Sequence, residues 1–241
     1  MNLYIVTGTS NGLGAALRKH LSHNANNMLV CLSRAPSGTV APINVQVDLA
    51  DVASIAQACT TATQAIAGKS FERAVLISNA GVIDPIGAFD SIEADVVAEN
   101  LRVNLLAPMV LMRWFAAATN GIASQRSVVN ISSGAAKRAI AGWSAYCAAK
   151  AGLEMATRVA ALEAPADLAI CSLAPGVIDT PMQAKVRGAA ASDFPDVDKF
   201  RAMKADGVLR DANVVAREII QLIESNKLTN GGNFDIRELN A

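Results

Sequence analysis

LYIVTGTSNGLG, residues 3–14, joins a short apolar run to three closely spaced glycines. The run at 3–7 is β-branched and aliphatic, as expected of a buried strand. Gly8, Gly12 and Gly14 follow it, and the next residues, AALRKHL, have a helical pattern. Glycines at this spacing permit a tight turn and let a pyrophosphate approach the free amide groups at a helix start. The stretch therefore predicts a strand, a phosphate-binding turn that includes Ser10, Asn11 and Leu13, and a helix. The alternative is that the glycines serve the turn alone.

The rest of the chain repeats this alternation of strand and helix. Further apolar runs are MLVCL, INVQV, AVLIS, SVVNIS, LAICSLA and, near the C-terminus, GGNFDI. Between them lie stretches rich in Ala, Leu and Glu that predict helices over 12–22, 51–68, 91–119, 144–163 and 211–225. Strands that are apolar throughout and alternate with helices indicate a parallel sheet covered on both faces. The sequence thus predicts a Rossmann-type, doubly wound α/β fold with three layers.

The chain of 241 residues is within the size of one α/β domain, and it contains no repeat or linker-like tract. We therefore expect a single domain over residues 1–241. Residues 181–207 lack a strand pattern and directly follow a strand end. In an open α/β sheet the ligand lies beyond the carboxyl ends of the strands. An irregular insertion at that edge predicts a lid over about 181–207.

Charge and composition exclude several classes of partner. The 21 basic and 21 acidic residues balance, and no block of like charge occurs, which argues against binding to nucleic acid or an anionic membrane surface. The longest apolar region, 105–118, is interrupted by Arg113 and is shorter than the roughly 18–20 residues of a spanning helix. A small-molecule ligand fits this composition better.

The cysteines and histidines predict neither disulfides nor a metal site. Four cysteines are scattered without metal-type spacing, at Cys31, Cys59, Cys147 and Cys171. His20 and His23 have no third candidate ligand beside them, so we predict no metal. The N-terminal residues run directly into the first predicted strand without a leader pattern. We expect a cytoplasmic protein.

The residues after the second and third strands bear on the choice of dinucleotide. An adenosine ribose with a free hydroxyl is usually held by Asp or Glu after the second strand, but Ser33 and Arg34 stand there instead. The guanidinium fork suits a 2′-phosphate, and the serine adds a hydroxyl. We therefore expect NADP(H), with Asp48 and Leu49 near the adenine. Asp48 is equally suited to capping the helix that starts near Asp51.

SAYCAAK, residues 144–150, places a tyrosine and a lysine four residues apart on a predicted helix. Such residues share one face, and a nearby ammonium is expected to lower the pKa of a phenol from its usual value near 10. The spacing alone is equally compatible with a structural pair. In VVNISSG, residues 128–134, Ser132 and Ser133 end a predicted strand, and Ser133 lies thirteen residues before Tyr146. Its hydroxyl can donate to the same substrate oxygen that the tyrosine protonates. Together with Lys150 these residues form a candidate proton-transfer site.

Five motifs in this order resemble the short-chain dehydrogenase/reductase family over essentially the whole chain. The motifs are TGxxxGxG, NAG at 79–81, the asparagine of VNLLAP at 104, a serine thirteen residues before YxxxK, and APG at 174–176.

The resemblance implies a role for each matching residue. Tyr146 would donate or accept the proton, Ser133 would polarise the carbonyl, Lys150 would bind the nicotinamide ribose and tune the tyrosine, and Asn104 would hold a water. The remaining cofactor contacts that the family implies are Asn79, Gly81, Pro175, Gly176, Ile178 and Thr180.

Two later segments, PGVIDTPMQAKVR and FRAMKADGVLRDANVVA, are similar to the sepiapterin reductase and benzil reductase branch of the family. That branch reduces vicinal dicarbonyls and related ketones with NADPH. Its pterin-reducing members anchor substrate with a carboxylate near the C-terminus, whose nearest counterpart here is Glu238. Trp143 and Met182 are further candidates for substrate contact, and each is also suited to packing.

The expected activity is reduction of a small ketone or dicarbonyl by NADPH. Alternatives are an NAD(P)-dependent secondary-alcohol dehydrogenase that runs oxidatively and a nonenzymatic NADP-sensing protein on the same fold. The small residues along helix 144–163 allow a close approach by the chain's own sheet or by a second subunit. Because the family commonly pairs subunits through this helix, we expect a homodimer or homotetramer.

Overall fold

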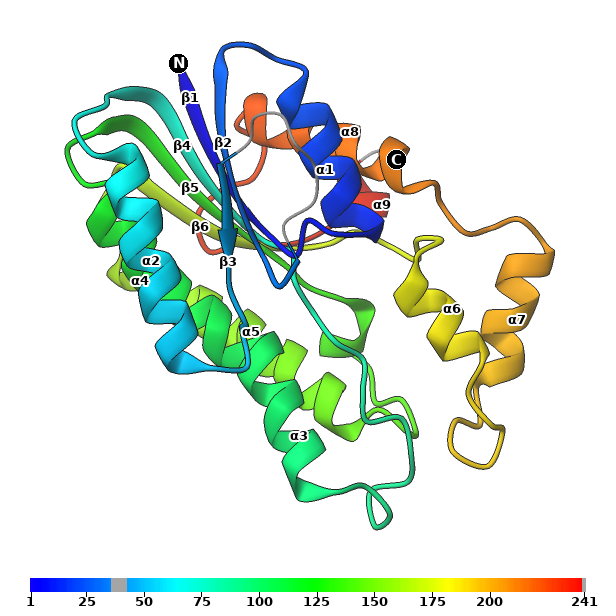
Figure 1. Ribbon diagram of the computed structural model, residues 1–241. Coiled ribbons are helices and arrows are strands. Elements are labelled where there is room, and N and C mark those ends of the chain that lie inside the picture. The colour runs from blue at the N-terminus through cyan, green and yellow to red at the C-terminus, as the bar shows by residue number, and fades with distance from the viewer. Residues whose placement is uncertain (36–42, 240–241) are drawn as a thin grey trace.

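The computed structural model describes residues 1–35 and 43–239. Within them, seven parallel strands form one sheet in the order β3-β2-β1-β4-β5-β6-β7. The strand order reverses direction between β1 and β4, as in a doubly wound fold. Figure 1 shows the sheet between two layers of helices, so the predicted Rossmann-type fold is confirmed. The strands are β1 Asn2–Thr7, β2 Asn27–Ser33, β3 Ile43–Gln46, β4 Phe71–Ser78, β5 Ala123–Ile131, β6 Leu168–Ala174 and β7 Asn233–Asp235.

Side-chain alternation along β1 divides the core between the two helical layers. Leu3 and Ile5 belong to the apolar cluster under α2 (Val52–Ile66), α4 (Ala107–Ala118) and α5 (Ser144–Glu163). Tyr4 and Val6 point to the other face, in the cluster under α1 (Gly12–Ser22) and α8 (Ala212–Glu224). All four side chains are fully buried. This two-sided burial explains why the strand is apolar throughout.

The helix predicted over 91–119 contains an unpredicted irregularity. α3 (Ala94–Leu101) passes through a π-helical turn at Arg102–Leu106 into α4. A π turn inserts one residue into the helical repeat and often occurs at a functional position; here it carries Asn104. The continuous run of 25 residues is long and apolar enough to cross a membrane by length and composition, unlike the shorter span expected from 105–118. Its α4 part packs on the sheet through the buried Leu111 and Phe115.

The segment 181–207, for which the sequence predicted irregular structure, contains two helices. α6 (Pro181–Arg187) and α7 (Val197–Ala205) pack on one another and extend to one side of the sheet layers (Figure 1). The helical pattern was missed because these helices are short and few of their residues are buried. Near the C-terminus, the expected strand GGNFDI ends at Asp235, where the short helix α9 (Ile236–Leu239) begins.

Candidate active site

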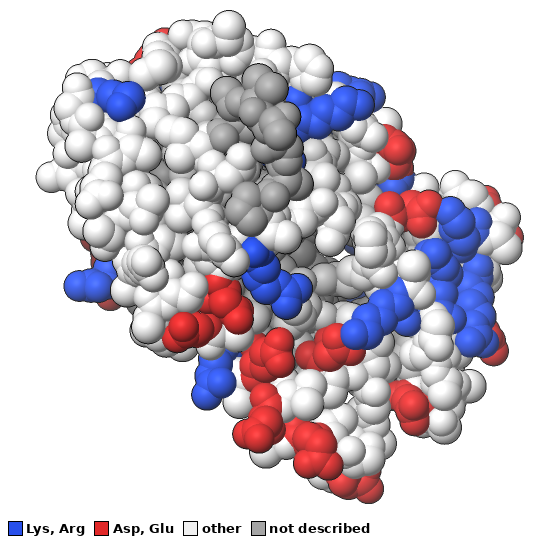
Figure 2. All heavy atoms as spheres, in the orientation of Figure 1, with Lys and Arg blue, Asp and Glu red and all other residues white. Residues whose placement is uncertain are grey.

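A cleft of about 370 Å³ lies at the carboxyl ends of the parallel strands. Figure 2 shows this face hollowed between the body of the sheet and the side that carries α6 and α7. Most of the residues that the sequence predicts for the site line this cleft. They are Gly8, Ser10, Asn11, Gly12, Leu13, Gly14, Ser33, Arg34, Asp48, Leu49, Asn79, Gly81, Ser133, Trp143, Tyr146, Lys150, Pro175, Gly176, Ile178, Thr180 and Met182.

The glycine loop leaves no room for side chains at its centre. A Cβ on Gly14 would lie 2.0 Å from the carbonyl oxygen of Gly8, and Gly8 itself has a φ of 70°. Asn11 precedes α1 in an extended conformation and makes no side-chain cap, and α1 has no acidic residue in its first turn. The amide groups at the start of α1 therefore face the cleft without a carboxylate. This arrangement fits a pyrophosphate.

Asn79 holds the glycine loop to the neighbouring strand. Its Nδ2 donates to the carbonyl oxygens of Thr7 at 3.0 Å and Gly8 at 3.3 Å. The Thr7 hydroxyl accepts from the backbone amides of Asn79 and Ala80 at 3.0 and 2.9 Å. Asn79 therefore fixes the shape of the cradle as well as lining it.

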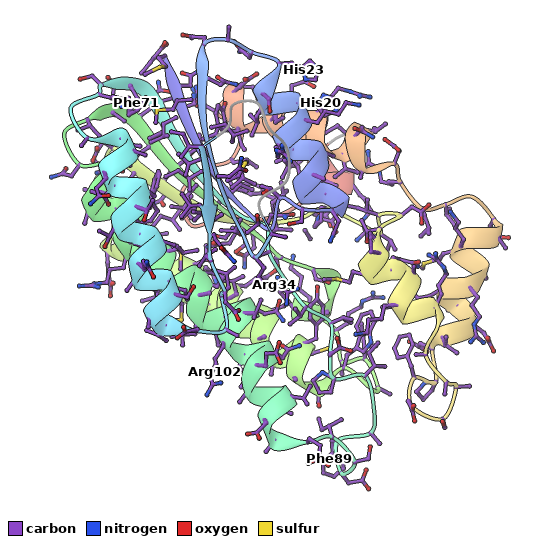
Figure 3. All side chains as sticks on the ribbon, viewed as in Figure 1. His20, His23, Arg34, Phe71, Phe89 and Arg102 are labelled. Carbon is purple, nitrogen blue, oxygen red and sulfur yellow. The ribbon has the colours of Figure 1, made fainter. Side chains whose placement is uncertain are left out.

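The end of β2 provides a polar corner without a carboxylate. Ser33 is buried and its hydroxyl donates to the carbonyl oxygen of Ala35 at 3.1 Å, as does that of Ser10. Arg34 is exposed, and Figure 3 shows it beyond the end of β2, on the same side of the sheet as the cleft. A guanidinium there suits a phosphate group better than a ribose hydroxyl.

Asp48 lines the cleft and does not cap α2. Asp51 caps α2, accepting from the amides of Ala53 and Ser54. Asp48 instead accepts from the amide of Ala50 at 3.0 Å and lines the cleft. The carboxylate is thus held at the carboxyl end of β3, where the adenine was expected.

Ser133, Tyr146 and Lys150 come together from β5 and α5. Ser133 follows β5 and its hydroxyl accepts from the amide of Ala135 at 3.2 Å. On α5, the Lys150 ammonium lies 5.8 Å from the centroid of the Tyr146 ring and donates to the carbonyl oxygen of Ile131 at 2.9 Å. Both side chains are more than nine-tenths buried. The hydroxyl, phenol and ammonium therefore share one desolvated end of the cleft.

Burial sets the protonation of this group, and it overturns one expectation. Burial raises the pKa of Tyr146 to about 12, although a side-chain hydrogen bond with Ser133 lowers it in part. Burial also lowers the pKa of Lys150 to about 8. The expectation that the ammonium would bring the phenol's pKa below its usual value is therefore wrong in this structure. Desolvation disfavours the charged form of each group.

Asn104 does not line the cleft but lies behind it. The side chain is fully buried in the π turn. Its Nδ2 donates to the carbonyl oxygen of Val82 at 2.8 Å and to Oδ1 of Asn100 at 2.9 Å, and its Oδ1 accepts from the amide of Val82 at 3.1 Å. The amide thus fixes the segment after β4, where a Cβ on Gly81 would lie 2.9 Å from the Asn104 oxygen.

The outer end of the cleft is aromatic. Trp143 stacks on Phe194 with ring centroids 4.9 Å apart and contacts Tyr146 edge-on at 5.7 Å. Phe200 of α7 lies 5.4 Å from Trp143, and Met182 of α6 joins the same apolar cluster. Trp143 therefore both lines the cleft and packs against the segment that contains α6 and α7.

The C-terminal carboxylate in the cleft is Asp235, not Glu238. Glu238 is exposed on α9 and is not among the cleft residues, whereas Asp235 and Arg237 are. Arg237 pairs with Asp235 through Nε at 2.9 Å, and this hydrogen bond lowers the pKa of the carboxyl. Asp235 ends β7, so the position of a strand end was the available signal. Gln183, also missed, lines the cleft from α6.

Comparison with known proteins agrees with this architecture. The model of the protein family described as short chain dehydrogenase matches residues 2–191 of this chain. The chain belongs to the short-chain dehydrogenase family. It is therefore an oxidoreductase of a family that uses nicotinamide cofactors.

Similar proteins include reductases of small carbonyl compounds. Benzil reductase ((S)-benzoin forming) of Bacillus subtilis is 34% identical over 99% of both chains. Sepiapterin reductase of Bos taurus is 27% identical, over 97% of this chain and 93% of that protein. The crystal structure of the KRED1-Pglu enzyme has a TM-score of 0.82 at 27% identity, covering 97% of this chain and 100% of the other. The predicted family and branch are confirmed by these matches.

Proposed function

We propose that this short-chain dehydrogenase is an NADPH-dependent carbonyl reductase that acts on small ketones, in particular vicinal dicarbonyls. The observation that carries the proposal is that Ser133, Tyr146 and Lys150 line the same cleft as the glycine loop. The similarity to benzil reductases supports the dicarbonyl class. Asp235, Trp143 and Met182 also line this cleft and are available to contact a substrate.

In this proposal the chain's residues move one proton and stabilise one oxygen. When bound, the reduced nicotinamide supplies a hydride, with its two electrons, to the carbonyl carbon. Tyr146 gives its proton to the oxygen of the same carbonyl, so that C=O becomes CH–OH. Ser133 donates a hydrogen bond to that oxygen as negative charge develops. Lys150 holds the ribose hydroxyls and returns protons toward the phenol.

The raised pKa of Tyr146 matches the protonation state from which reduction starts. A phenol with a pKa of about 12 remains protonated at neutral pH and is ready to donate. An alcohol dehydrogenase running oxidatively would need the phenolate, which burial disfavours. A nonenzymatic NADP-sensing protein would have no use for the Ser133, Tyr146 and Lys150 arrangement.

Arg34 supports the preference for NADPH. No acidic side chain stands at the end of β2, and Arg34 lines the cleft there. Exchanging the guanidinium for a carboxylate in Arg34→Glu should repel a 2′-phosphate and suit a free ribose hydroxyl. We expect the ratio of kcat/KM for NADPH to that for NADH to fall at least about tenfold. An unchanged ratio of the two kcat/KM values would show that Arg34 does not bind the 2′-phosphate.

A panel of ketones tests the function directly. We expect oxidation of NADPH, followed by absorbance, with benzil and simple diketones, and slower reaction with monoketones. Sepiapterin extends the panel to pterins, and the reverse reaction with secondary alcohols and NADP⁺ tests the oxidative alternative. Binding of NADPH without turnover of any compound would favour the sensing protein instead.

We also propose a cytoplasmic homodimer or homotetramer with residues 181–207 as its lid. The four cysteines are free and mostly buried, which suits a reducing compartment. An apolar surface on the π turn, α4 and α5 supports pairing of subunits through these helices. It comprises Leu106, Met109, Met155, Val159 and Leu162, all exposed.

A further inference from the structure

Gln183 is a buried amide on the inner face of the lid. Within α6 only Gln183 and Val186 are buried, and they lie on one face because they are three residues apart. Val186 packs in the cluster that contains Trp143 and Tyr146. Gln183 therefore shares the buried face of α6 with a residue of that cluster, and it lines the cleft.

Both polar atoms of this amide lack a partner. Gln183 is 6% exposed, and neither Oε1 nor Nε2 has a hydrogen bond to any residue in 1–35 or 43–239. A buried amide without partners destabilises a fold, and native proteins rarely keep one without a reason. An apolar side chain such as leucine would fill this apolar cluster at no such cost. The amide is therefore suited to a ligand that supplies the missing bonds.

Trp143, which also lines the cleft, carries a second unsatisfied group. Its indole Nε1 is buried and has no acceptor among the described residues, and the ring lines the cleft beside Tyr146. The ring stacks on Phe194, and the N–H is the only polar group of the tryptophan side chain. Two unpartnered donors, the indole N–H and the Gln183 Nε2, thus belong to residues that line the same cleft as Tyr146.

We propose that Gln183, assisted by Trp143, donates a hydrogen bond to the second oxygen of a vicinal dicarbonyl substrate. The inference rests on the proposed function, and it identifies the second carbonyl oxygen as the substrate group that α6 binds. The phenol engages the oxygen that is reduced, and the adjacent oxygen is the polar atom nearest to it in such a substrate. A monoketone of the same shape has nothing to offer these donors and leaves them unsatisfied.

Benzil and deoxybenzoin form a matched pair for the test, since both carry two phenyl rings and deoxybenzoin lacks one carbonyl. In Gln183→Leu we expect the ratio of kcat/KM for benzil to that for deoxybenzoin to fall at least about tenfold. Trp143→Phe, which keeps the aromatic stack, should lower the same ratio. The same substitution on an exposed helix face away from the cleft, Gln57→Leu in α2, should leave the ratio unchanged.

Binding and stability provide readouts besides turnover. Calorimetric titration of benzoin into the protein saturated with NADP⁺ should show weaker binding by Gln183→Leu, and its melting temperature should not fall, because no protein partner is lost. An unchanged ratio, a lower melting temperature without a change in ratio, or weaker NADPH binding in place of the ratio change would each overturn the proposal. If the unaltered protein reduces neither diketone nor monoketone, the proposed function fails first.

Discussion

The Lys150 ammonium lies 5.8 Å from the centroid of the Tyr146 ring and is anchored to the carbonyl oxygen of Ile131, not to a carboxylate. Both side chains are buried, and a backbone carbonyl at the end of β5 accepts the lysine's hydrogen bond. In this setting the phenol is a protonated acid and the lysine is a weakened cation. Each property leads to a separate measurement.

Tyr146→Phe removes the proton donor and keeps the ring. Because the aromatic contact with Trp143 does not need the hydroxyl, we expect the fold and NADPH binding to persist. Turnover should fall by about 10²–10⁴-fold, the usual contribution of a general acid. Stopped-flow or steady-state NADPH oxidation measures the loss, and fluorescence titration checks the cofactor. Turnover comparable to that of the unaltered protein would remove Tyr146 from the proposed chemistry.

Lys150→Met tests the lysine through stability and pH. The pKa of Lys150 is about 8 in the folded chain and 10.5 as the ordinary value. Between these values the unfolded chain binds more protons, so this group makes the folded state more stable as pH rises. The methionine variant lacks the effect. We expect the free energy of unfolding of the unaltered protein, relative to the variant, to increase by about 2–3 kcal/mol from pH 7 to pH 10.

Denaturant unfolding of both proteins at the two pH values gives this difference. The raised pKa of Tyr146 does not contribute, because both proteins retain the tyrosine. The cysteines with raised pKa values are likewise common to both and cancel. A relative stability that is the same at pH 7 and pH 10 would mean that Lys150 titrates as an exposed lysine does.

Local patterns predicted the fold and the glycine loop because their physical causes are local. The GxxxGxG spacing already indicates that Gly14 must be a glycine, and the structure shows that a Cβ there would collide with Gly8. The carboxyl ends of the strands of a parallel sheet lie at one edge, so the residues that follow them are also predictable. The sequence patterns did not predict properties that depend on packing between segments distant in the chain. The raised pKa of Tyr146 comes from burial, and the exposure of Glu238 follows from where β7 ends. Gln183 carries no local signal, because its missing partners appear only in the folded chain.

Gly14→Ala tests the cradle. The added Cβ would lie 2.0 Å from the Gly8 carbonyl oxygen and 2.5 Å from Nδ2 of Asn79, so the loop must shift. We expect a loss of stability of about 1–3 kcal/mol and at least tenfold weaker NADPH binding, roughly one lost phosphate contact. Gly188→Ala is the matched control, since its Cβ would lie at an ordinary 3.4 Å from the Lys185 carbonyl oxygen. Intact binding in Gly14→Ala would show that the loop can open without harm to the site.

Leu162→Glu tests the apolar surface of α4 and α5 as a subunit contact. Leu162 is 87% exposed, and Met155 and Val159 precede it on the same stripe of α5. Exposed apolar residues gathered on one surface favour burial against a partner, and a carboxylate there opposes it. We expect light scattering to show a dimer or tetramer for the unaltered protein and a smaller species for the variant.

The control for this experiment is another exposed apolar residue, on a different helix of the same layer. Val52 begins α2 and is 54% exposed, and a glutamate at a helix start is favourable, so Val52→Glu should keep the assembly. Since Leu162 lies far along α5 from Tyr146, loss of assembly without loss of NADPH binding would separate pairing from the active site. A monomer in the unaltered protein would show that the surface is simply exposed and that the oligomer proposal is wrong.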